Sequence, residues 1–266
     1  MEFDDAFANA AYIADGARYP DKWAAQAAQF RASARHEPDI PYGAGARLRF
    51  DLFHPVRPAR GVVVFVHGGY WRMFDKSYWS HLAAGPLALG WAVAIPSYDL
   101  CPQATITQIG DQIASAVSVV AQRVSGPIRL TGHSAGAQLV ARIGAIGPNA
   151  AWKSRLTGVF PISPVADLTP LCRTTMNADL GLDAQEAHAQ SPLNMPAPAC
   201  KVEIWVGADE RPVFIEQSQY LAKYWGCGLI LEHGKHHFNI IEGLSDPIGA
   251  LTRAVCYEEI HVAPIG

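Results

Sequence analysis

A serine flanked by glycines follows directly after a short apolar run, in the segment IRLTGHSAGAQL (128–139). Its central part, GHSAG (132–136), matches G-x-S-x-G, the sharp strand-to-helix turn that lifts a serine hydroxyl above a sheet. Glycines on either side remove the Cβ atoms that would clash in so tight a turn. The same pattern also occurs in ordinary glycine-rich turns. Ser134 is therefore a candidate nucleophile whose role depends on partners elsewhere in the chain.

A loop that could bind an oxyanion precedes the serine in the chain. HGGYW (67–71) ends the apolar run GVVVFVH (61–67), and its two glycines let the backbone turn its amides toward a bound carbonyl oxygen. His67 itself is expected to hold the loop rather than to act as a base. We expect the oxyanion donors among the amides of Gly68, Gly69, Tyr70 and Ala135, the last at the start of the helix after Ser134.

A general base is expected near the end of the chain, because nucleophile, acid and base follow in this order where such a serine turn is used. HGKHHFNIIEGL (233–244) offers His233, His236 and His237. We favour His237, directly before Phe238, with His236 as the alternative. Three histidines within five residues could also bind a metal, but no acidic or thiol side chain joins them at ligand spacing. We therefore expect no metal.

The acid of such a triad is expected after the apolar run KVEIWVG (201–207), which Asp209 and Glu210 follow. A carboxylate at this point would accept the imidazole N–H, fix its tautomer and stabilise the imidazolium. Counting three residues beyond Gly207 favours Glu210. Spacing alone leaves Asp209 open as the alternative acid.

The elements that must position these residues are short apolar runs that predict strands buried on both faces. Helical patterns alternate with the runs, which indicates an α/β fold with a mostly parallel, doubly wound sheet and helices on both faces. Reactive groups gather at the carboxyl ends of the strands in such sheets. The predicted strands cover residues 61–67, 91–98, 128–133, 157–163, 201–207 and 228–233.

The chain predicts a single domain over residues 1–266, without internal repeats or a low-complexity linker. Residues 1–45 are expected to form an N-terminal helical extension that ends in a Pro/Gly-rich break at 37–46. RLRFDLFHP (47–55) alternates polar and apolar residues like a half-exposed edge strand. The proline-rich segment 164–200 interrupts the alternation and is a candidate cap, lid or pocket wall.

Composition narrows the functional classes. The chain has 266 residues, of which 50% are hydrophobic and 17% charged, so it can bury a sizeable core. A formal net charge of −3 offers no electrostatic basis for binding nucleic acid or an anionic membrane. Five cysteines without C-x-x-C spacing, an acidic start and no long apolar run favour a cytoplasmic protein with reduced thiols. A homodimer is compatible with this composition but is not indicated by it.

Several motifs in register resemble the arylformamidase (kynurenine formamidase) group of α/β-hydrolases. The resemblance runs from about Asp51 to Leu244 and rests on HGGYW, SYDLCP, GHSAGAQL, ISPVADLTPL with a following SPL, FIEQS and HFNIIEGL. The group's acid-x-P-x-F block is ERPVF here, which places its acid on Glu210. Family members more often carry Asp at that position, and more often His where this chain has Gln138.

The resemblance implies a serine hydrolase that cleaves the formamide of N-formyl-L-kynurenine, through an acyl-serine and without a cofactor. A carboxylesterase of small aryl or short-chain esters is the alternative. A non-catalytic binding protein of the same fold is disfavoured, because serine, histidine and acid are all present. We expect an aromatic pocket wall from Tyr70, Trp71 and Tyr98. Candidate contacts for the substrate's amino-acid end are Arg72, Lys76 and Asn194.

Overall fold

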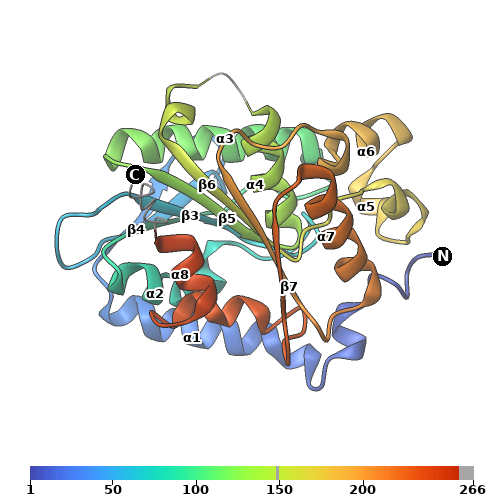
Figure 1. Cartoon of the computed structure of the whole chain (residues 1–266), viewed down its shortest axis with the longest axis horizontal. Helices are drawn as coiled ribbons and strands as arrows, with labels where there is room; N and C mark the ends of the chain where they lie inside the picture. The colour runs from blue at the N-terminus through green and yellow to red at the C-terminus, as the bar shows by residue number, and fades with distance from the viewer. Residues whose placement is uncertain (148–149, 258–266) are drawn as a thin grey trace, which may run out of the picture.

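A computed structural model describes residues 1–147 and 150–257 of the chain, which fold around one eight-stranded sheet (Figure 1). The strand order is β1-β2-β4-β3-β5-β6-β7-β8. The first two strands run antiparallel to their neighbours, and the other pairs are parallel. The strands are β1 (His36–Pro41), β2 (Arg49–Phe53), β3 (Val62–Val66), β4 (Ala92–Pro96), β5 (Ile128–His133), β6 (Leu156–Ile162), β7 (Lys201–Gly207) and β8 (Gly228–Glu232).

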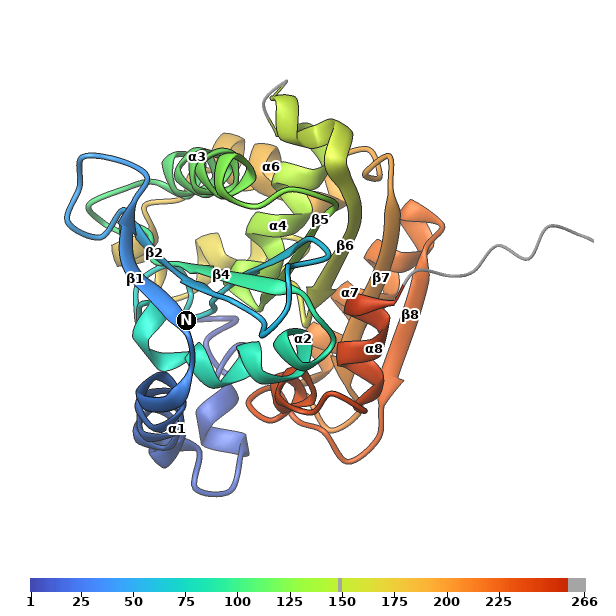
Figure 2. The same ribbon diagram turned by 90° about the vertical axis from the view of Figure 1, so that its left-hand side faces the viewer.

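Helices cover both faces of the sheet (Figure 2). The helices α3, α4 and α6 lie on one side, and α1, α2 and α8 lie on the other. This arrangement confirms the predicted α/β sheet with helices on both faces. The helices are α1 (Tyr19–Ser33), α2 (Ala84–Ala88), α3 (Ile106–Arg123), α4 (Ala135–Ile146), α5 (Asn177–Leu180), α6 (Ala184–Gln190), α7 (Pro212–Trp225) and α8 (Ala250–Cys256).

The helix α3 illustrates how local sequence determines an element. Thr105 caps its start, with the side chain accepting from the amide of Gln108 while the Gln108 side chain accepts from the Thr105 amide. The apolar residues that recur every three or four positions are fully buried against the sheet. These buried residues are Ile106, Ile109, Ile113, Val117 and Val120.

The edge of the sheet differs from the sequence-based expectation. The segment 37–46, expected to be a break, contributes most of β1, and β1 forms the edge. Strand β2 was expected at the edge but lies between β1 and β4, with four of its five residues buried. Its one buried polar residue is Asp51, whose carboxylate forms an ion pair with Lys76. The polar residue at position 51 in the alternating pattern of residues 47–55 therefore belongs to a buried ion pair and not to a solvent-exposed face.

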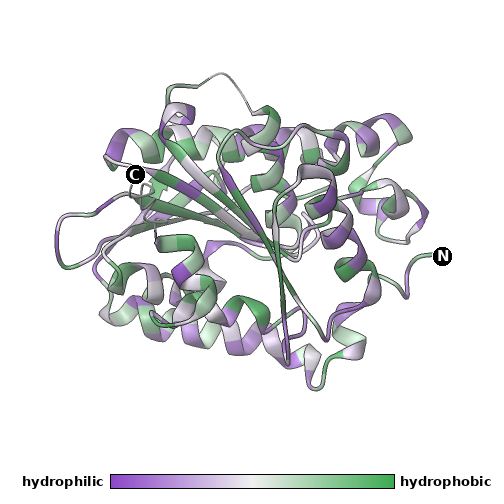
Figure 3. Cartoon of the chain, viewed as in Figure 1, coloured by the Kyte–Doolittle hydropathy of each residue, from purple (hydrophilic) through white to green (hydrophobic). Residues whose placement is uncertain are grey.

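Apolar side chains on the two faces of the sheet form separate core clusters. The strands at the centre are mostly hydrophobic along their whole length, whereas the helices alternate between hydrophilic and hydrophobic residues (Figure 3). A third, smaller cluster joins α4 to α7. No helix among the described residues is both long and apolar enough to span a bilayer.

The N-terminal extension is helical in two short 3-10 turns (Asn9–Tyr12 and Gly16–Arg18) and in α1. Its first residues are held by contacts to segments far along the chain. Phe7 packs edge-on against Phe214, with ring centroids 5.9 Å apart. Arg211 donates to the Asp5 carboxylate at 2.7 Å and lies 3.6 Å from the ring centroid of Tyr12. The extension is thereby fastened to the start of α7.

Candidate active site

Ser134 lies at the turn between β5, which ends at His133, and α4, which begins at Ala135. Its backbone has φ 54° and ψ −115°, a conformation that non-glycine residues adopt only when the surrounding structure enforces it. The side chain is buried from bulk solvent at 2% exposure but lines a cavity. The serine therefore has the strained geometry of a nucleophile turn.

Close backbone packing explains the two glycines of this turn. A Cβ on Gly132 would lie 2.4 Å from the carbonyl oxygen of Gly136, and one on Gly136 would lie 2.0 Å from that of Val66. Both distances are far shorter than any real carbon–oxygen contact. The glycines thus allow α4 to start directly beside the end of β3, which brings Ser134 next to the loop that follows β3.

That loop, residues 67–75, has an unusual backbone. Gly69, Tyr70 and Trp71 all have positive φ, at 113°, 49° and 55°. Within the described part of the chain, the amides of Gly69 and Tyr70 donate to no protein acceptor. The amide of Ala135 is the first of a helix and has no acceptor within that helix. Gly68 lines the same cavity as Ser134, and a Cβ on it would lie 3.1 Å from the serine's own Cβ.

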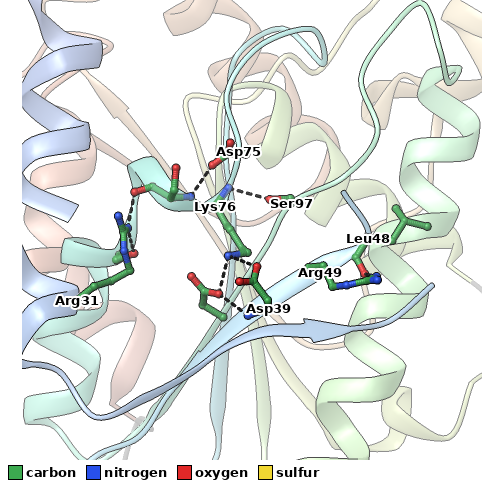
Figure 4. A network of polar contacts seen from close by, with 10 residues as sticks. Arg31, Asp39, Leu48, Arg49, Asp75, Lys76 and Ser97 are labelled. Carbon is green, nitrogen blue, oxygen red and sulfur yellow. Dashed lines mark hydrogen bonds and ion pairs between the residues drawn. The ribbon is translucent and has the colours of Figure 1, made fainter. Parts of the chain in front are cut away.

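A network of ion pairs fastens the end of this loop to the sheet (Figure 4). The Lys76 ammonium lies 2.7 Å from the Asp51 carboxylate and 2.9 Å from that of Asp39. The Lys76 amide also donates to the Ser97 hydroxyl. Asp51 is on β2 and only 1% exposed, so the lysine stabilises a charge that would otherwise be buried alone.

His237 and Glu210 form a short, buried contact. Nδ1 of His237 donates to Oε2 of Glu210 at 2.6 Å, and the two residues are 3% and 7% exposed. The histidine ring also packs against Phe214, with centroids 4.2 Å apart, and lines the same cavity as Ser134. The order of these residues along the chain is serine, acid, histidine, as expected from the sequence.

The structure brings Glu210, and not Asp209, to the histidine. The other carboxylate oxygen of Glu210 accepts from the Ser163 hydroxyl at 2.5 Å and from the Gly207 amide at 2.8 Å. The Glu210 carboxylate therefore accepts from three donors, which hold it against the His237 ring. Asp209 is exposed, and its backbone amide donates to the carbonyl of Lys235. Sequence reasoning missed Ser163, which follows β6 in ISPVADL and has no local signal of its own.

The other histidines have separate positions. His236 bonds to the Tyr19 hydroxyl at 3.1 Å, and His233 is exposed after β8.

His67 is fully buried and donates from Nδ1 to the Gly68 carbonyl. Burial lowers the pKa of His67 to about 4. Burial also holds the pKa of His133, next to the serine, well below its usual range, so both rings are neutral near pH 7. Among the described residues, no group of three or more His, Cys, Asp or Glu has metal-binding geometry.

A cavity of about 430 Å³ opens onto the serine. Its walls come from the N-terminal extension, the 67–75 loop and the residues around Ser134 and His237. None of the described residues that line it is Asp, Glu, Lys or Arg. Its aromatic residues are Phe7, Trp23, Tyr70, Phe74, Trp79 and Phe238.

Two of the residues expected in the aromatic wall lie elsewhere. Trp71 is fully buried and donates from its indole nitrogen to Gln138, whose amide nitrogen donates to a backbone carbonyl. Tyr98 is fully buried, stacks on His67 at 4.3 Å and donates to the His67 carbonyl. Both residues thus pack in the core against the 67–75 loop and do not line the cavity. Of the three, Tyr70 alone lines the cavity.

The expected cap and amino-acid contacts also differ. The segment 164–200 contributes no residue to the cavity, and residues 7–20 cover it instead. Each expected polar contact is bonded elsewhere: Arg72 pairs with Asp179 at 2.8 Å, Lys76 with the β2 network, and Asn194 with His188. Residues 7–20 are more than a hundred residues from Ser134 in the chain, so no local sequence pattern indicates that they cover its cavity.

Comparison with known proteins defines the family. Residues 63–198 match the model of a family described as alpha/beta hydrolase fold. The kynurenine formamidase of Salmo salar is 30% identical over 230 residues, 78% of this chain and 76% of that protein. That of Drosophila melanogaster is 30% identical over 231 residues, 76% of this chain and 75% of that protein.

A solved structure shares the fold of this chain. A crystal structure from Silicibacter sp. TM1040, described as a candidate thioesterase, is 48% identical and superposes with a TM-score of 0.94, covering 97% of this chain and all of that one. The chain belongs to the α/β-hydrolase family and, within it, to the kynurenine formamidase group. The resemblance seen in the sequence motifs is thus confirmed, and the protein is a hydrolase.

Proposed function

We propose that the protein hydrolyses aryl formamides, with Ser134 as nucleophile, His237 as general base and Glu210 as the acid that orients it. The observation that carries this proposal is the 2.6 Å contact of Glu210 with His237, a histidine that lines the same cavity as Ser134. The strained backbone of Ser134 and its position at the start of α4 support the assignment.

The reaction follows from these positions. His237 Nε2 takes the proton of Ser134 Oγ as the oxygen attacks the formyl carbon, while its Nδ1–H remains bonded to the ionised Glu210. The amides of Gly69, Tyr70 and Ala135 hold the oxyanion, and loss of one such donor typically costs about 3 kcal/mol of transition-state stabilisation. His237 then gives its proton to the leaving aryl amine. Water, activated by the same histidine, hydrolyses the formyl-serine and releases formate.

The substrate that we propose is N-formyl-L-kynurenine. Relatives named kynurenine formamidase support it, and so does the cavity, whose aromatic and aliphatic walls suit an aryl ring. An aryl amine is a better leaving group than an alkyl amine, because the ring shares the nitrogen lone pair.

A second candidate is the hydrolysis of esters or thioesters. The observation that favours it is the 48% identical structure described as a candidate thioesterase. An apolar cavity would also accept an acyl chain, and the same triad would cleave either bond. The two candidates differ in the leaving atom, which is nitrogen in one and oxygen or sulfur in the other.

The experiment that separates them is a comparison of kcat/KM for four substrates: N-formyl-L-kynurenine, formanilide, p-nitrophenyl acetate and a short-chain acyl thioester. The formamidase proposal expects the highest value for N-formyl-L-kynurenine, even though activated esters are chemically more reactive. A higher kcat/KM for the ester or thioester would overturn it. Ser134→Ala should remove all four activities, which tests whether they share one site.

A further inference from the structure

A second cavity, of about 230 Å³, lies against the Glu210–His237 pair. It shares Asn9 and His237 with the large apolar cavity, so the two cavities adjoin at these side chains. Their chemistry differs, because the second cavity has carboxylates and a guanidinium on its walls. The remaining lining residues are Tyr12, Ile13, Asp209, Glu210, Arg211 and Pro212.

Arg211 is fixed in this cavity and retains unused donors. Its Nη2 donates to the backbone carbonyl and the carboxylate of Asp5, and its guanidinium stacks over Tyr12. Among the described residues, Nε is buried without a partner. An arginine side chain has five N–H donors, so this one can still bind a carboxylate.

Asp209 supplies the opposite charge. Its side chain is exposed and makes no hydrogen bond or ion pair in the described part of the chain. Its backbone amide donates to the carbonyl of Lys235 at 2.9 Å, which fixes the residue on the loop that also carries Glu210. Neighbouring positions of one short loop thus present an unpaired carboxylate and a partly used guanidinium to the same cavity.

Asn9 stands at the boundary between the cavities with one end unsatisfied. The Tyr70 hydroxyl donates to the Phe7 carbonyl at 2.7 Å, so it must accept from Asn9, which identifies the facing group as the amide nitrogen. The carboxamide oxygen is then buried without a donor in the described part of the structure. A buried acceptor of this kind is costly unless a ligand satisfies it.

We propose that this second cavity binds the α-amino-acid end of the leaving amine, with the carboxylate on Arg211 and the ammonium on Asp209. The inference rests on the proposed formamidase function. A zwitterion would be strongly destabilised in the large cavity, whose walls carry no charge to pair with it. His237 must protonate the leaving nitrogen and therefore contacts the leaving group. Because His237 also lines the second cavity, the polar end of that group has a matched site directly beyond the histidine.

The test uses four formamides that differ in which charged groups they carry, and one of them, formanilide, lacks the whole side chain. They are N-formyl-L-kynurenine, its decarboxylated analogue, its deaminated analogue and formanilide, which has neither charge. Asp209→Asn should raise KM about tenfold, with little change in kcat, for the two substrates that carry the ammonium. Arg211→Gln should do the same for the two that carry the carboxylate. Asp209→Asn should leave KM for formanilide unchanged, and Arg211→Gln should raise it no more than loss of the Asp5 contact alone does.

A control separates recognition from support of the N-terminal extension, since Arg211 also holds Asp5. Asp5→Asn weakens that contact but keeps the guanidinium, so it should affect all four substrates alike. If Arg211→Gln or Asp209→Asn changes KM equally for all four substrates, or for none, the inference is wrong and the formamidase proposal stands. If the wild type hydrolyses none of the four, both are wrong.

Discussion

Glu210 and His237 are 27 residues apart in the chain, yet the carboxylate lies 2.6 Å from the ring nitrogen, with Ser163 and the Gly207 amide holding its other oxygen. Three donors leave this carboxylate little freedom to rotate. The histidine is therefore held in the tautomer that leaves Nε2 free to accept a proton.

Glu210→Gln should lower kcat about 10³- to 10⁴-fold with little change in the folded structure, because an amide can present its N–H to the ring and favour the wrong tautomer. Steady-state kinetics on formanilide would measure this. Glu216→Gln, an exposed carboxylate on α7, is the matched control and should retain the wild-type kcat. If Asp209→Asn rather than Glu210→Gln removes kcat, the acid has been assigned wrongly.

Phe7→Ala tests the role of the N-terminal extension as cover of the cavity. Phe7 is 2% exposed, lines the cavity and packs on Phe214, so its truncation should loosen residues 7–20. We expect KM for formanilide to rise about tenfold and amide hydrogen exchange in residues 7–20 to accelerate. Phe3→Ala, in the N-terminal extension but outside the cavity lining, should leave KM near the wild-type value. Equal effects of the two variants would contradict a covering role.

Lys76→Met tests the ion pairs beneath the 67–75 loop. The substitution leaves the buried Asp51 carboxylate without its cation, and breaking a buried pair in this way typically costs about 3–5 kcal/mol. Urea unfolding would measure the loss. Lys22→Met removes a solvent-accessible pair with Glu242 and should cost less than about 1 kcal/mol. A similar small loss for both variants would mean that the Asp51 charge is stabilised in another way.

Buried histidines predict how stability depends on pH. Burial lowers the pKa of His67 and of His81 to about 4, and neither ring nitrogen of His81 has a partner among the described residues. The unfolded chain, with a histidine pKa near 6.5, then binds protons that the folded state does not. The free energy of unfolding is therefore unaffected by these two histidines above pH 6.5. It falls as the pH drops from 6.5 toward about 4, by about 1.4 kcal/mol per pH unit for each histidine.

His81→Phe should reduce the fall in the free energy of unfolding by about 1.4 kcal/mol per pH unit between pH 6.5 and about 4. The variant should be as stable as the wild type at pH 7, because the His81 ring nitrogens have no partner among the described residues. Thermal or urea unfolding at pH 5, 6 and 7 would show the difference between the two slopes. An unchanged slope in the variant would mean that His81 is protonated in the folded state.

Sequence reasoning reached the parts of the site that have local signatures. Ser134 and the glycines of the 67–75 loop belong to turns whose backbone needs those residues. The strands are buried on both faces, so their continuous apolar runs predicted the α/β sheet. The structure places Glu210 rather than Asp209 beside the histidine, as both the spacing from Gly207 and the family block favoured.

The remainder depends on contacts between distant segments. The cover of the cavity comes from residues 7–20, whose fastening to Arg211 and Phe214 spans about 200 residues of sequence. Trp71, expected in the pocket, has a positive φ and is buried in the core, where its indole nitrogen donates to Gln138. The strand β1 was missed because its prolines and exposed pattern suit an edge, where missing donors do no harm.

The most direct test of Ser134 activation by the His237–Glu210 pair is intact-protein mass spectrometry with a fluorophosphonate probe, followed by peptide mapping. One adduct per chain is expected, located on Ser134, with formamidase activity falling in proportion to labelling. Ser134→Ala should not be labelled, and Glu210→Gln should be labelled far more slowly. Labelling at another residue, or full formamidase activity in a chain labelled at Ser134, would contradict the mechanism.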